Sequence, residues 1–291
     1  MPATLTKQSR CKVNLLLNIL GKRADGFHEL ETVMYPLNLF DRLTFKQGGN
    51  SLRLTCTDPS LAVDETNLVH RAAAAFFKTT GIQDGVEIHL EKHIPLAAGL
   101  GGGSGNAATT LLGLNELFGG PLPTGRLGEL AATLGSDVPF FLQDKPAIAT
   151  GRGEKVQPLD SFPALRGSAF LLVHPGFGVP TAWAYQQLAR FPDALNGRVG
   201  RAEKLVQLLR KSDAQNAASE FYNSLELPVF EKYPLLAVGR DFLREQGATV
   251  ALMSGSGSTV FGIYPSGAHG KKAEGAVRDK FGPSWTAVIE A

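Results

Sequence analysis

Cysteine is scarce in this sequence. Cys11 and Cys56 are the only two among 291 residues, and they form neither a metal-binding spacing nor a disulfide framework. Such sparing use of cysteine is typical of proteins in a reducing compartment, where thiols stay reduced. The sequence therefore predicts no site that is built on cysteine.

Long apolar runs are missing as well. No stretch of ~18 consecutive apolar residues occurs, so the sequence predicts no membrane-spanning helix. The N-terminus has no apolar signal core, and the segment before Lys12 is too short for a typical transit peptide. We therefore expect a cytoplasmic protein without a membrane partner.

An excess of one charge is also absent. The 29 lysines and arginines nearly balance the 27 aspartates and glutamates, which leaves a formal net charge of +2. The basic residues are scattered and form no run, so nucleic acid is not an expected partner. The histidines show no metal-ligand spacing, and we expect no metal site built from protein side chains alone.

What the sequence does contain is material for a large core. Hydrophobic residues make up 43% and charged residues 19% of the chain, which is typical of a well-buried globular protein. The length suits one large or two medium domains. The pattern of strands and helices restarts after residue 150, so we predict an N-terminal domain over 1–155 and a C-terminal domain over 156–291.

Hydrophobic periodicity and turn residues predict an α+β fold, because hairpin-like strands alternate with helices. In the first half we expect strands over 12–20 and 85–95, a hairpin of strands 41–47 and 51–57, helices over 67–80, 106–118 and 125–134, and a short apolar strand over 136–142. In the second half we expect a strand over 168–175, helices over 181–190, 201–211 and 233–247, a strand–turn–strand unit over 248–264, and a closing helix over 271–281.

A glycine run precedes the predicted helix over 106–118. Five of the seven residues from Gly99 to Gly105 are glycine. Glycines let a backbone approach phosphate oxygens, and the N–H groups at a helix start favour an anion. The run is not a Walker loop, because Asn106 and Ala107 follow it, and it also fails the G-x-G-x-x-G fingerprint of dinucleotide-binding proteins. A phosphate cradle and a merely packed helix entry both remain open at this point.

Two charged residues stand out because they interrupt or adjoin apolar runs. Lys12 lies in the first predicted strand, and Asp137 precedes "VPFFL". If both were buried, each would need an opposite charge, and a neighbouring lysine would keep Asp137 ionised. Taken singly, Lys12 could be a surface lysine of a strand and Asp137 a turn or capping residue.

The segment "PLAAGLGGGSGNAAT" over 95–109 resembles the phosphate-loop motif of the GHMP small-molecule kinases. The runs "KVNLLLNILGKRADGFHELETV", "NLVHRAA", "GSDVPFFL", "ATGRGEKVQPL" and "LMSGSGSTVFGIY" extend this resemblance over nearly the whole chain. They are similar to the branch that phosphorylates the 2-hydroxyl of a cytidine-diphosphate-linked methylerythritol in the non-mevalonate route to isoprenoids. The resemblance implies a two-domain fold of mixed and antiparallel sheets with helices, an active site in the cleft between domains, ATP and Mg²⁺ as cofactors, and a monomer or homodimer.

The resemblance also implies roles for individual residues. Lys12 and Asp137 match the catalytic pair. The ATP-binding positions are Pro95, Ala97, Ala98, Gly99, Leu100, Gly101, Gly102, Gly103, Ser104, Gly105, Asn67 and Lys92. The acceptor-binding positions are Asn14, Phe27, His28, Thr181 and Tyr185, and the turn Gly255, Ser256 and Gly257 supports the phosphate loop. The family commonly has a second serine where this chain has Gly105, so only Ser104 is expected to supply a hydroxyl.

Phe27 and Tyr185 are expected to stack on the cytosine ring, while His28 forms hydrogen bonds to its edge. Asn14 lies on the same strand face as Lys12, because side chains two residues apart along a strand share a face. Without the resemblance, His28 would be an ordinary loop histidine and Tyr185 a core residue of a helix.

Other functions remain as alternatives. A kinase for another alcohol, such as homoserine or mevalonate, would have no use for "ADGFHEL". A non-catalytic nucleotide-binding relative would have no need to keep Lys12, Ser104 and Asp137. A nicotinamide-dependent oxidoreductase is excluded, because the glycine fingerprint is broken.

Overall fold

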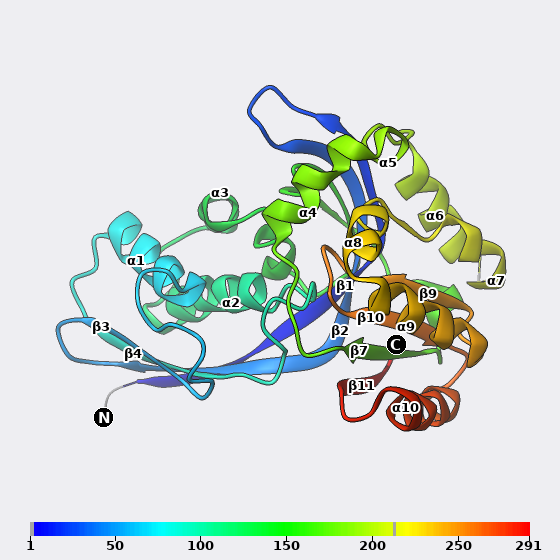
Figure 1. Cartoon of the computed structure of the whole chain (residues 1–291). Coiled ribbons are helices and arrows are strands. Elements are labelled where there is room, and N and C mark those ends of the chain that lie inside the picture. Colours follow the sequence, from blue (N-terminus) through cyan, green and yellow to red (C-terminus); the bar gives the residue numbers. More distant parts are fainter. Residues whose placement is uncertain (1–2, 212–213) are drawn as a thin grey trace. The chain divides into compact units, whose positions relative to one another are not determined.

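The computed structural model describes residues 3–211 and 214–291. The chain forms two compact units that are interleaved along the sequence (Figure 1). Unit 1 comprises Met1–Cys11, Leu39–Pro95 and Gly101–Asp144, and unit 2 comprises Lys12–Asn38, Leu96–Leu100 and Lys145–Ala291. The predicted boundary at residue 155 follows chain order, whereas these units exchange segments. Both units combine strands with helices, so the predicted α+β class is confirmed.

Two long strands contribute to both units. They are β1 (Thr4–Lys22) and β2 (His28–Gln47). In the larger sheet the strand order is β3-β4-β2-β1-β8, and β5 with its partner β6 joins a further edge of β2. The predicted strand over 12–20 is therefore confirmed as the second half of a longer strand.

In unit 1 the end of β2 is followed by β3 (Leu52–Cys56), but these two strands form no hairpin. Instead, β4 (Val86–Glu91) lies between them, antiparallel to β2 and parallel to β3. The predicted hairpin over 41–57 is therefore wrong. The loop between β2 and β3 is hydrogen-bonded to Gly85, the residue before β4. The Gly85 N–H donates to Gly49 O, and the Gly85 carbonyl accepts from Gly48 N–H, at 3.1 Å each. These bonds fix the start of β4 between β2 and β3. Val86, Ile88 and Leu90 of β4 are buried on one face of the sheet.

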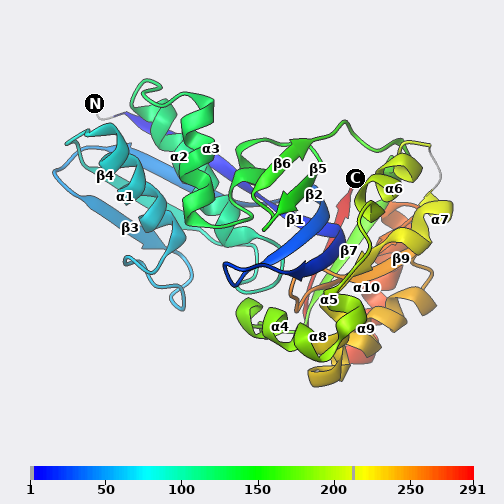
Figure 2. The same cartoon turned by 90° about the horizontal axis from the view of Figure 1, so that it is seen from above.

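The helices of unit 1 are α1 (Leu68–Thr80), α2 (Gly102–Leu117) and α3 (Thr124–Leu134), and they pack against one another (Figure 2). As predicted, α1 ends at Gly81, which adopts the left-handed conformation with φ 71°. Helix α2 begins inside the glycine run and not after it. The spacing of Ala107, Leu111, Leu114 and Phe118 predicts one apolar stripe on this helix. The first three residues are buried, whereas Phe118 is the C-cap residue and is partly exposed.

The apolar segment after α3 is a 3₁₀ helix, η1 (Pro139–Leu142), and not the predicted strand over 136–142. Pro139 has no amide hydrogen for a sheet ladder, and its ring fixes φ near the helical value. The rings of Phe140 and Phe141 meet edge to face with centroids 5.1 Å apart. Apolar character alone does not separate a short buried strand from a helical turn.

Unit 2 contains a second, antiparallel sheet of order β11-β7-β10-β9. Its strands are β7 (Ala169–His174), β9 (Val250–Met253), β10 (Val260–Tyr264) and β11 (Trp285–Glu290). Helices α9 (Pro234–Glu245) and α10 (Gly267–Phe281) pack on it (Figure 1). The predicted strand–turn–strand unit is confirmed. The sequence interpretation missed β11, so α10 is not the closing element.

The rest of unit 2 surrounds the second half of β1 and the first half of β2. Strand β8 (Tyr222–Asn223) pairs with β1 in parallel, and the β5 (Ala147–Gly151) and β6 (Lys155–Pro158) hairpin pairs with β2 (Figure 2). The remaining helices are α4 (Thr181–Gln187), α5 (Pro192–Leu195), α6 (Arg201–Leu209), α7 (Ala214–Ala217), α8 (Glu226–Lys232) and the short 3₁₀ helices η2 (Pro163–Leu165), η3 (Leu188–Arg190) and η4 (Ala218–Glu220). The sequence interpretation missed β5 and β6.

Candidate active site

The segment Leu96–Leu100 of unit 2 has a strained backbone that packs against the turn between β9 and β10. Ala97 and Gly99 have positive φ angles of 51° and 76°. Ser254 Oγ donates to Gly99 O at 2.9 Å, and Thr259 N–H donates to Ala98 O at 3.1 Å. A Cβ atom at Gly99 would lie 2.1 Å from Ser254 O. Only glycine fits here, because the two backbones touch.

The glycine run continues in unit 1 as the start of α2. Gly101 is the N-cap with φ 71°, and no described side chain caps the first turn of the helix. Uncapped N–H groups at a helix N-terminus, together with the helix dipole, favour an anion. Ser104, the third residue of α2, is partly exposed. The start of α2 is thus chemically suited to a phosphate group.

Gly105, where the family commonly has a serine, is explained by close packing. A Cβ atom at Gly105 would lie 2.6 Å from Arg10 O and 3.1 Å from Ser9 Oγ. A serine at this position would force α2 away from β1. By contrast, a Cβ atom at Gly103 would meet only Leu68 Cδ1 at 3.5 Å, an ordinary contact.

Lys12 is buried in unit 2, with 3% of its surface exposed. Its ammonium donates to Asn14 Oδ1 at 2.5 Å and to Gly99 O at 3.3 Å, and its N–H donates to Leu100 O at 2.9 Å. Asn14 is held in turn by Thr32, whose Oγ1 accepts from Asn14 Nδ2 at 2.9 Å. Lys12 is therefore not a surface lysine: it is held at the glycine-rich segment.

Asp137 belongs to unit 1, where it occupies the turn between α3 and η1 and is partly exposed. This is the turn position that the sequence left open as an alternative. Lys12 belongs to unit 2. The pairing of these two side chains stays a prediction.

Lys92 and Asn67 have structural contacts within unit 1. The Lys92 ammonium forms a buried ion pair with Asp41 and donates to Asn106 Oδ1 at 3.3 Å. The other Asp41 oxygen accepts from the N–H groups of His93 and Ile94. Asn67 caps α1, since its Oδ1 accepts from Val69 N–H at 2.8 Å. Their expected contacts with a nucleotide stay predictions.

The predicted base-binding residues Phe27, His28 and Tyr185 all belong to unit 2, and two of their rings are in contact. The rings of His28 and Tyr185 lie 5.2 Å apart with a tilt of 40°. Phe27 is 50% exposed, and the Arg152 guanidinium covers one face of its ring at 4.6 Å from the centroid. The structure thus brings these predicted residues onto one unit and adds Arg152, which the sequence interpretation did not select.

Burial lowers the pKa of His28, and the nearby charge of Lys22 lowers it further. The imidazole is therefore neutral at pH 7, with one nitrogen as a donor and the other as an acceptor. A neutral imidazole of this kind can form hydrogen bonds with the edge of a pyrimidine.

Thr181 begins α4, and its hydroxyl is hydrogen-bonded to Ser256 Oγ at 2.8 Å. Ser256 is buried, and its neighbours Gly255 and Gly257 have φ angles of 55° and 83°. The β9–β10 turn therefore contacts both the segment Leu96–Leu100 and α4, the helix that carries Tyr185.

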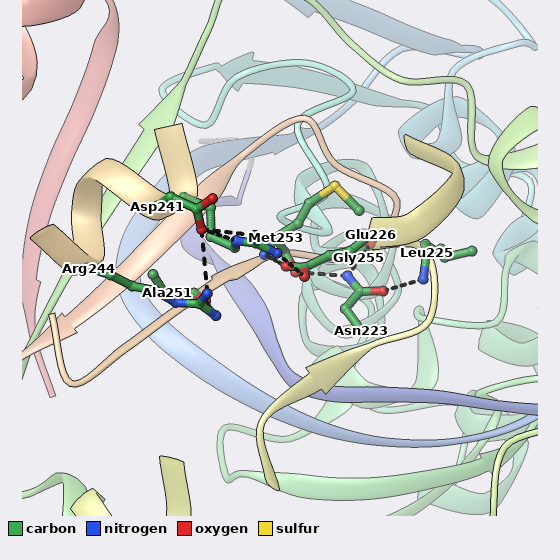
Figure 3. A network of polar contacts seen from close by, with 9 residues as sticks. Asn223, Leu225, Glu226, Asp241, Arg244, Ala251, Met253 and Gly255 are labelled. Carbon is green, nitrogen blue, oxygen red and sulfur yellow. Dashed lines mark hydrogen bonds and ion pairs between the residues drawn. The ribbon is translucent and has the colours of Figure 1, made fainter. Parts of the chain in front are cut away.

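Sequence reasoning missed Asn223 and Glu226, which hold this turn from the other side (Figure 3). Asn223 Nδ2 donates to Met253 O and to Gly255 O, at 2.8 Å each, and its Oδ1 accepts from Leu225 N–H at 2.9 Å. Glu226 accepts from Met253 N–H at 2.8 Å and pairs with Arg240 at 2.9 Å. Burial raises the pKa of Glu226. The sequence signal that could have identified them is the segment "YNSLEL" over 222–227, in which polar and apolar residues are interspersed.

Comparison with known families agrees with this geometry. The model of the GHMP kinases N terminal domain matches residues 67–145, and the model of the GHMP kinases C terminal region matches residues 202–283. The chain belongs to the GHMP kinase family.

Within that family the chain is similar to one kind of enzyme. It is 41% identical over 261 residues to 4-diphosphocytidyl-2-C-methyl-D-erythritol kinase of Syntrophotalea carbinolica, with 88% of each chain covered. The crystal structure of a 4-(cytidine 5'-diphospho)-2C-methyl-D-erythritol kinase matches with a TM-score of 0.81 and 35% identity, over 99% of this chain and 100% of that one. Homoserine kinase from Cytophaga hutchinsonii matches with a TM-score of 0.72 over 98% and 94% of the chains, but at 18% identity it shows the fold alone.

Two features are absent from the part of the chain that the structure describes. None of its helices combines the length and apolarity needed to cross a bilayer. Nor do three or more histidine, cysteine, aspartate or glutamate side chains gather there in a way that could hold a metal ion.

Proposed function

We propose that this chain is an ATP-dependent kinase that phosphorylates the 2-hydroxyl of 4-diphosphocytidyl-2-C-methyl-D-erythritol in the non-mevalonate route to isoprenoid precursors. The observation that carries the proposal is the contact between the His28 and Tyr185 rings on unit 2, with the exposed ring of Phe27 next to His28 in the chain. Aromatic faces and a neutral histidine suit a pyrimidine base, which an alcohol such as homoserine lacks. The names of the similar enzymes support the same substrate.

The nucleotide phosphates are expected at the backbone from Ala97 to Gly101 and at the first turn of α2. The positive φ angles of Ala97, Gly99 and Gly101, and a first turn of α2 that no described side chain caps, suit the backbone N–H groups to an anion. The Ser104 hydroxyl would add one more donor or a ligand for a cation. Binding of ATP therefore depends mainly on main-chain geometry.

In the transfer step, the bond between the γ-phosphorus and the oxygen of ADP breaks while the acceptor oxygen bonds to phosphorus. We assign Asp137 to orient the hydroxyl and to take up its proton, and Lys12 to offset charge on the transferring group. A free aspartate is a weak base toward an alcohol. Orientation of the hydroxyl is therefore at least as important as proton uptake.

The described residues fit Mg²⁺ only together with a nucleotide, because they provide no cluster of three ligating side chains. Mg²⁺ in phosphoryl-transfer sites is commonly held by substrate phosphates and one or two protein oxygens. We propose the Ser104 hydroxyl as one such oxygen. Bound there, the ion would neutralise phosphate charge.

A coupled assay of ADP release tests the proposed function. Purified protein is given ATP with the cytidylated acceptor, homoserine or mevalonate in parallel. We expect turnover with the cytidylated acceptor, and faster turnover with either other alcohol would overturn the assignment. The reaction needs only small molecules as partners, and we place it in the cytoplasm with the chain as a monomer or homodimer.

A further inference from the structure

The turn between β9 and β10 connects two parts of unit 2 that the proposed function uses. Ser254 Oγ donates to Gly99 O at 2.9 Å, and Ser256 Oγ is hydrogen-bonded to Thr181 Oγ1 at 2.8 Å. The first contact reaches the segment Leu96–Leu100, and the second reaches the start of α4. Both depend on the position of the turn.

Asn223 fixes the backbone of this turn (Figure 3). Both hydrogens of its amide group are donated to carbonyl oxygens, of Met253 and of Gly255, and its oxygen accepts from Leu225 N–H. The residue is 2% exposed, so water does not compete for these bonds. A planar group with two donors and one acceptor is required, and no other side chain of this size provides it.

The turn has little room to move without displacing the surroundings of Lys12. A Cβ atom at Gly255 would lie 3.1 Å from Gly99 O and 3.4 Å from Asn14 Oδ1. Both oxygens accept from the Lys12 ammonium. A shift of Gly255 would therefore disturb these two contacts of the lysine.

We propose that Asn223 is a positioning residue. It holds the β9–β10 turn, and this turn fixes the positions of Gly99 and of the Lys12 ammonium. The inference rests on the proposed function in so far as Lys12 acts in phosphoryl transfer. Asn223 touches neither reactant and acts only through the turn. The same contacts predict that it matters more for the nucleotide side than for base recognition at His28 and Tyr185.

The variant Asn223→Asp provides the sharpest test. It is nearly isosteric, but the ionised carboxylate has no hydrogen to donate and would face two carbonyl oxygens. These neighbours and burial raise the pKa of the introduced carboxyl group. The protonated form can donate one hydrogen bond, so the activity of the variant relative to the wild type should fall as the pH rises through that raised pKa.

Ser224→Ala is the matched control. Ser224 is buried and directly follows Asn223, the last residue of β8, and its hydroxyl accepts from Ile19 N–H of β1 at 3.0 Å. Its removal costs one buried hydrogen bond without altering the turn. If Asn223→Asp does not fold, Ser254→Ala replaces it as the test variant. It removes only the hydrogen bond from the turn to Gly99 O.

The measurements are kcat, the affinity for the ATP analogue AMP-PNP by calorimetry, the affinity for CMP, and the melting temperature. For Asn223→Asp we expect a loss of about tenfold or more in kcat or AMP-PNP affinity at pH 8, as for one or two lost hydrogen bonds. The affinity for CMP should fall less than the affinity for AMP-PNP, because the turn reaches α4 only through Ser256 and Thr181. Ser254→Ala should shift the same quantities in the same direction, and Ser224→Ala should change only the melting temperature.

Equal losses in Asn223→Asp and Ser224→Ala, or a loss that does not depend on pH, would overturn the proposal. AMP-PNP binding separates this failure from failure of the proposed function. If the wild type binds AMP-PNP but does not phosphorylate the cytidylated acceptor, the substrate assignment fails. The role of Asn223 is then still decided by the nucleotide affinities.

Discussion

At the scale of single residues, the surroundings of a side chain decide which of its possible roles it can have. Lys12 could have been a surface lysine, yet it is buried and donates to Asn14 and Gly99. Lys92 was an expected nucleotide contact, and its ammonium is engaged by the buried carboxylate of Asp41. The two lysines, one in each unit, thus differ in the chemistry that they can perform.

Asp137→Asn should lower kcat by about 100-fold or more, because general base or orienting groups typically contribute that much. The amide keeps the size of the side chain but cannot take up a proton. ATP affinity, measured by calorimetry, should stay close to that of the wild type. Turnover near the wild-type value would remove Asp137 from the mechanism.

Phe27→Ala and Tyr185→Ala should each raise KM for the cytidylated acceptor by about tenfold, since stacking of a base on an aromatic ring contributes ~1–3 kcal/mol. The KM for ATP is the internal control and should hardly change.

Arg152→Met tests whether the covered face of Phe27 matters: it removes the cation but keeps an apolar side chain. We expect a smaller rise in the same KM, and no rise would show that Phe27 needs no support.

If His28 reads the base as proposed, acceptor binding should depend on pH. Its pKa is lowered by burial, so the neutral form persists to more acidic pH than in a free histidine. As the pH falls through this lowered pKa, protonation removes the acceptor nitrogen, and KM for the cytidylated acceptor should rise. His28→Gln, which does not titrate, should abolish this rise. A wild-type KM that is flat from pH 5 to pH 8 would contradict the role of His28 in reading the base.

At the scale of elements, the approach of α2 to β1 depends on Gly105. Gly105→Ser places a Cβ atom 2.6 Å from Arg10 O, so either the helix or the strand must shift. Such overpacking typically costs about 1–3 kcal/mol of stability. Thermal unfolding should show a lower melting temperature for this variant.

Gly103→Ala is the matched control on the same helix. Its Cβ atom would have only an ordinary contact with Leu68. Replacement of a helical glycine by alanine typically stabilises a protein by ~0.4–1 kcal/mol. Its melting temperature should stay equal or rise, and equal losses in both variants would rule out the steric explanation for Gly105.

Local sequence predicts elements whose signals are local, and fails where a partner is distant. Helix α1 was predicted to its last residue because Gly81 ends it, and the alternation in β4 was clear. The partner of β3 could not be predicted, since β4 comes some thirty residues later in the chain and inserts between two strands that looked like a hairpin. Asn223 was missed for the same reason: its acceptors are backbone carbonyls of Met253 and Gly255, which carry no side-chain signature.

At the scale of the whole molecule, the fold defines the family but leaves the substrate open. The chain shares its fold with a homoserine kinase at only 18% identity. We therefore propose that residues such as His28 and Tyr185, and not the fold, discriminate between acceptors.

A uridine analogue of the acceptor tests this discrimination directly. Uracil presents a carbonyl where cytosine has an amino group, so a site that pairs with the base edge leaves a group unpaired. We expect kcat/KM with the uridine form to fall by at least tenfold for the wild type and by much less for His28→Gln. Equal use of both forms by the wild type would leave the acceptor as an unspecified alcohol.

The interleaving of the two units has a consequence for synthesis on the ribosome. Unit 1 is complete once Asp144 has emerged, but Lys12–Asn38 belongs to unit 2. The second half of β1, with the buried residues Leu16 and Leu17, can pair on one edge with β2, which follows it in the chain, but its neighbour on the other edge, β8, comes about 200 residues later. At ~5–20 residues per second this wait lasts on the order of ten seconds or more. During this time the nascent chain exposes the unpaired edge of an apolar strand, so it should be a substrate for chaperones, and a fragment that stops at residue 155 should aggregate.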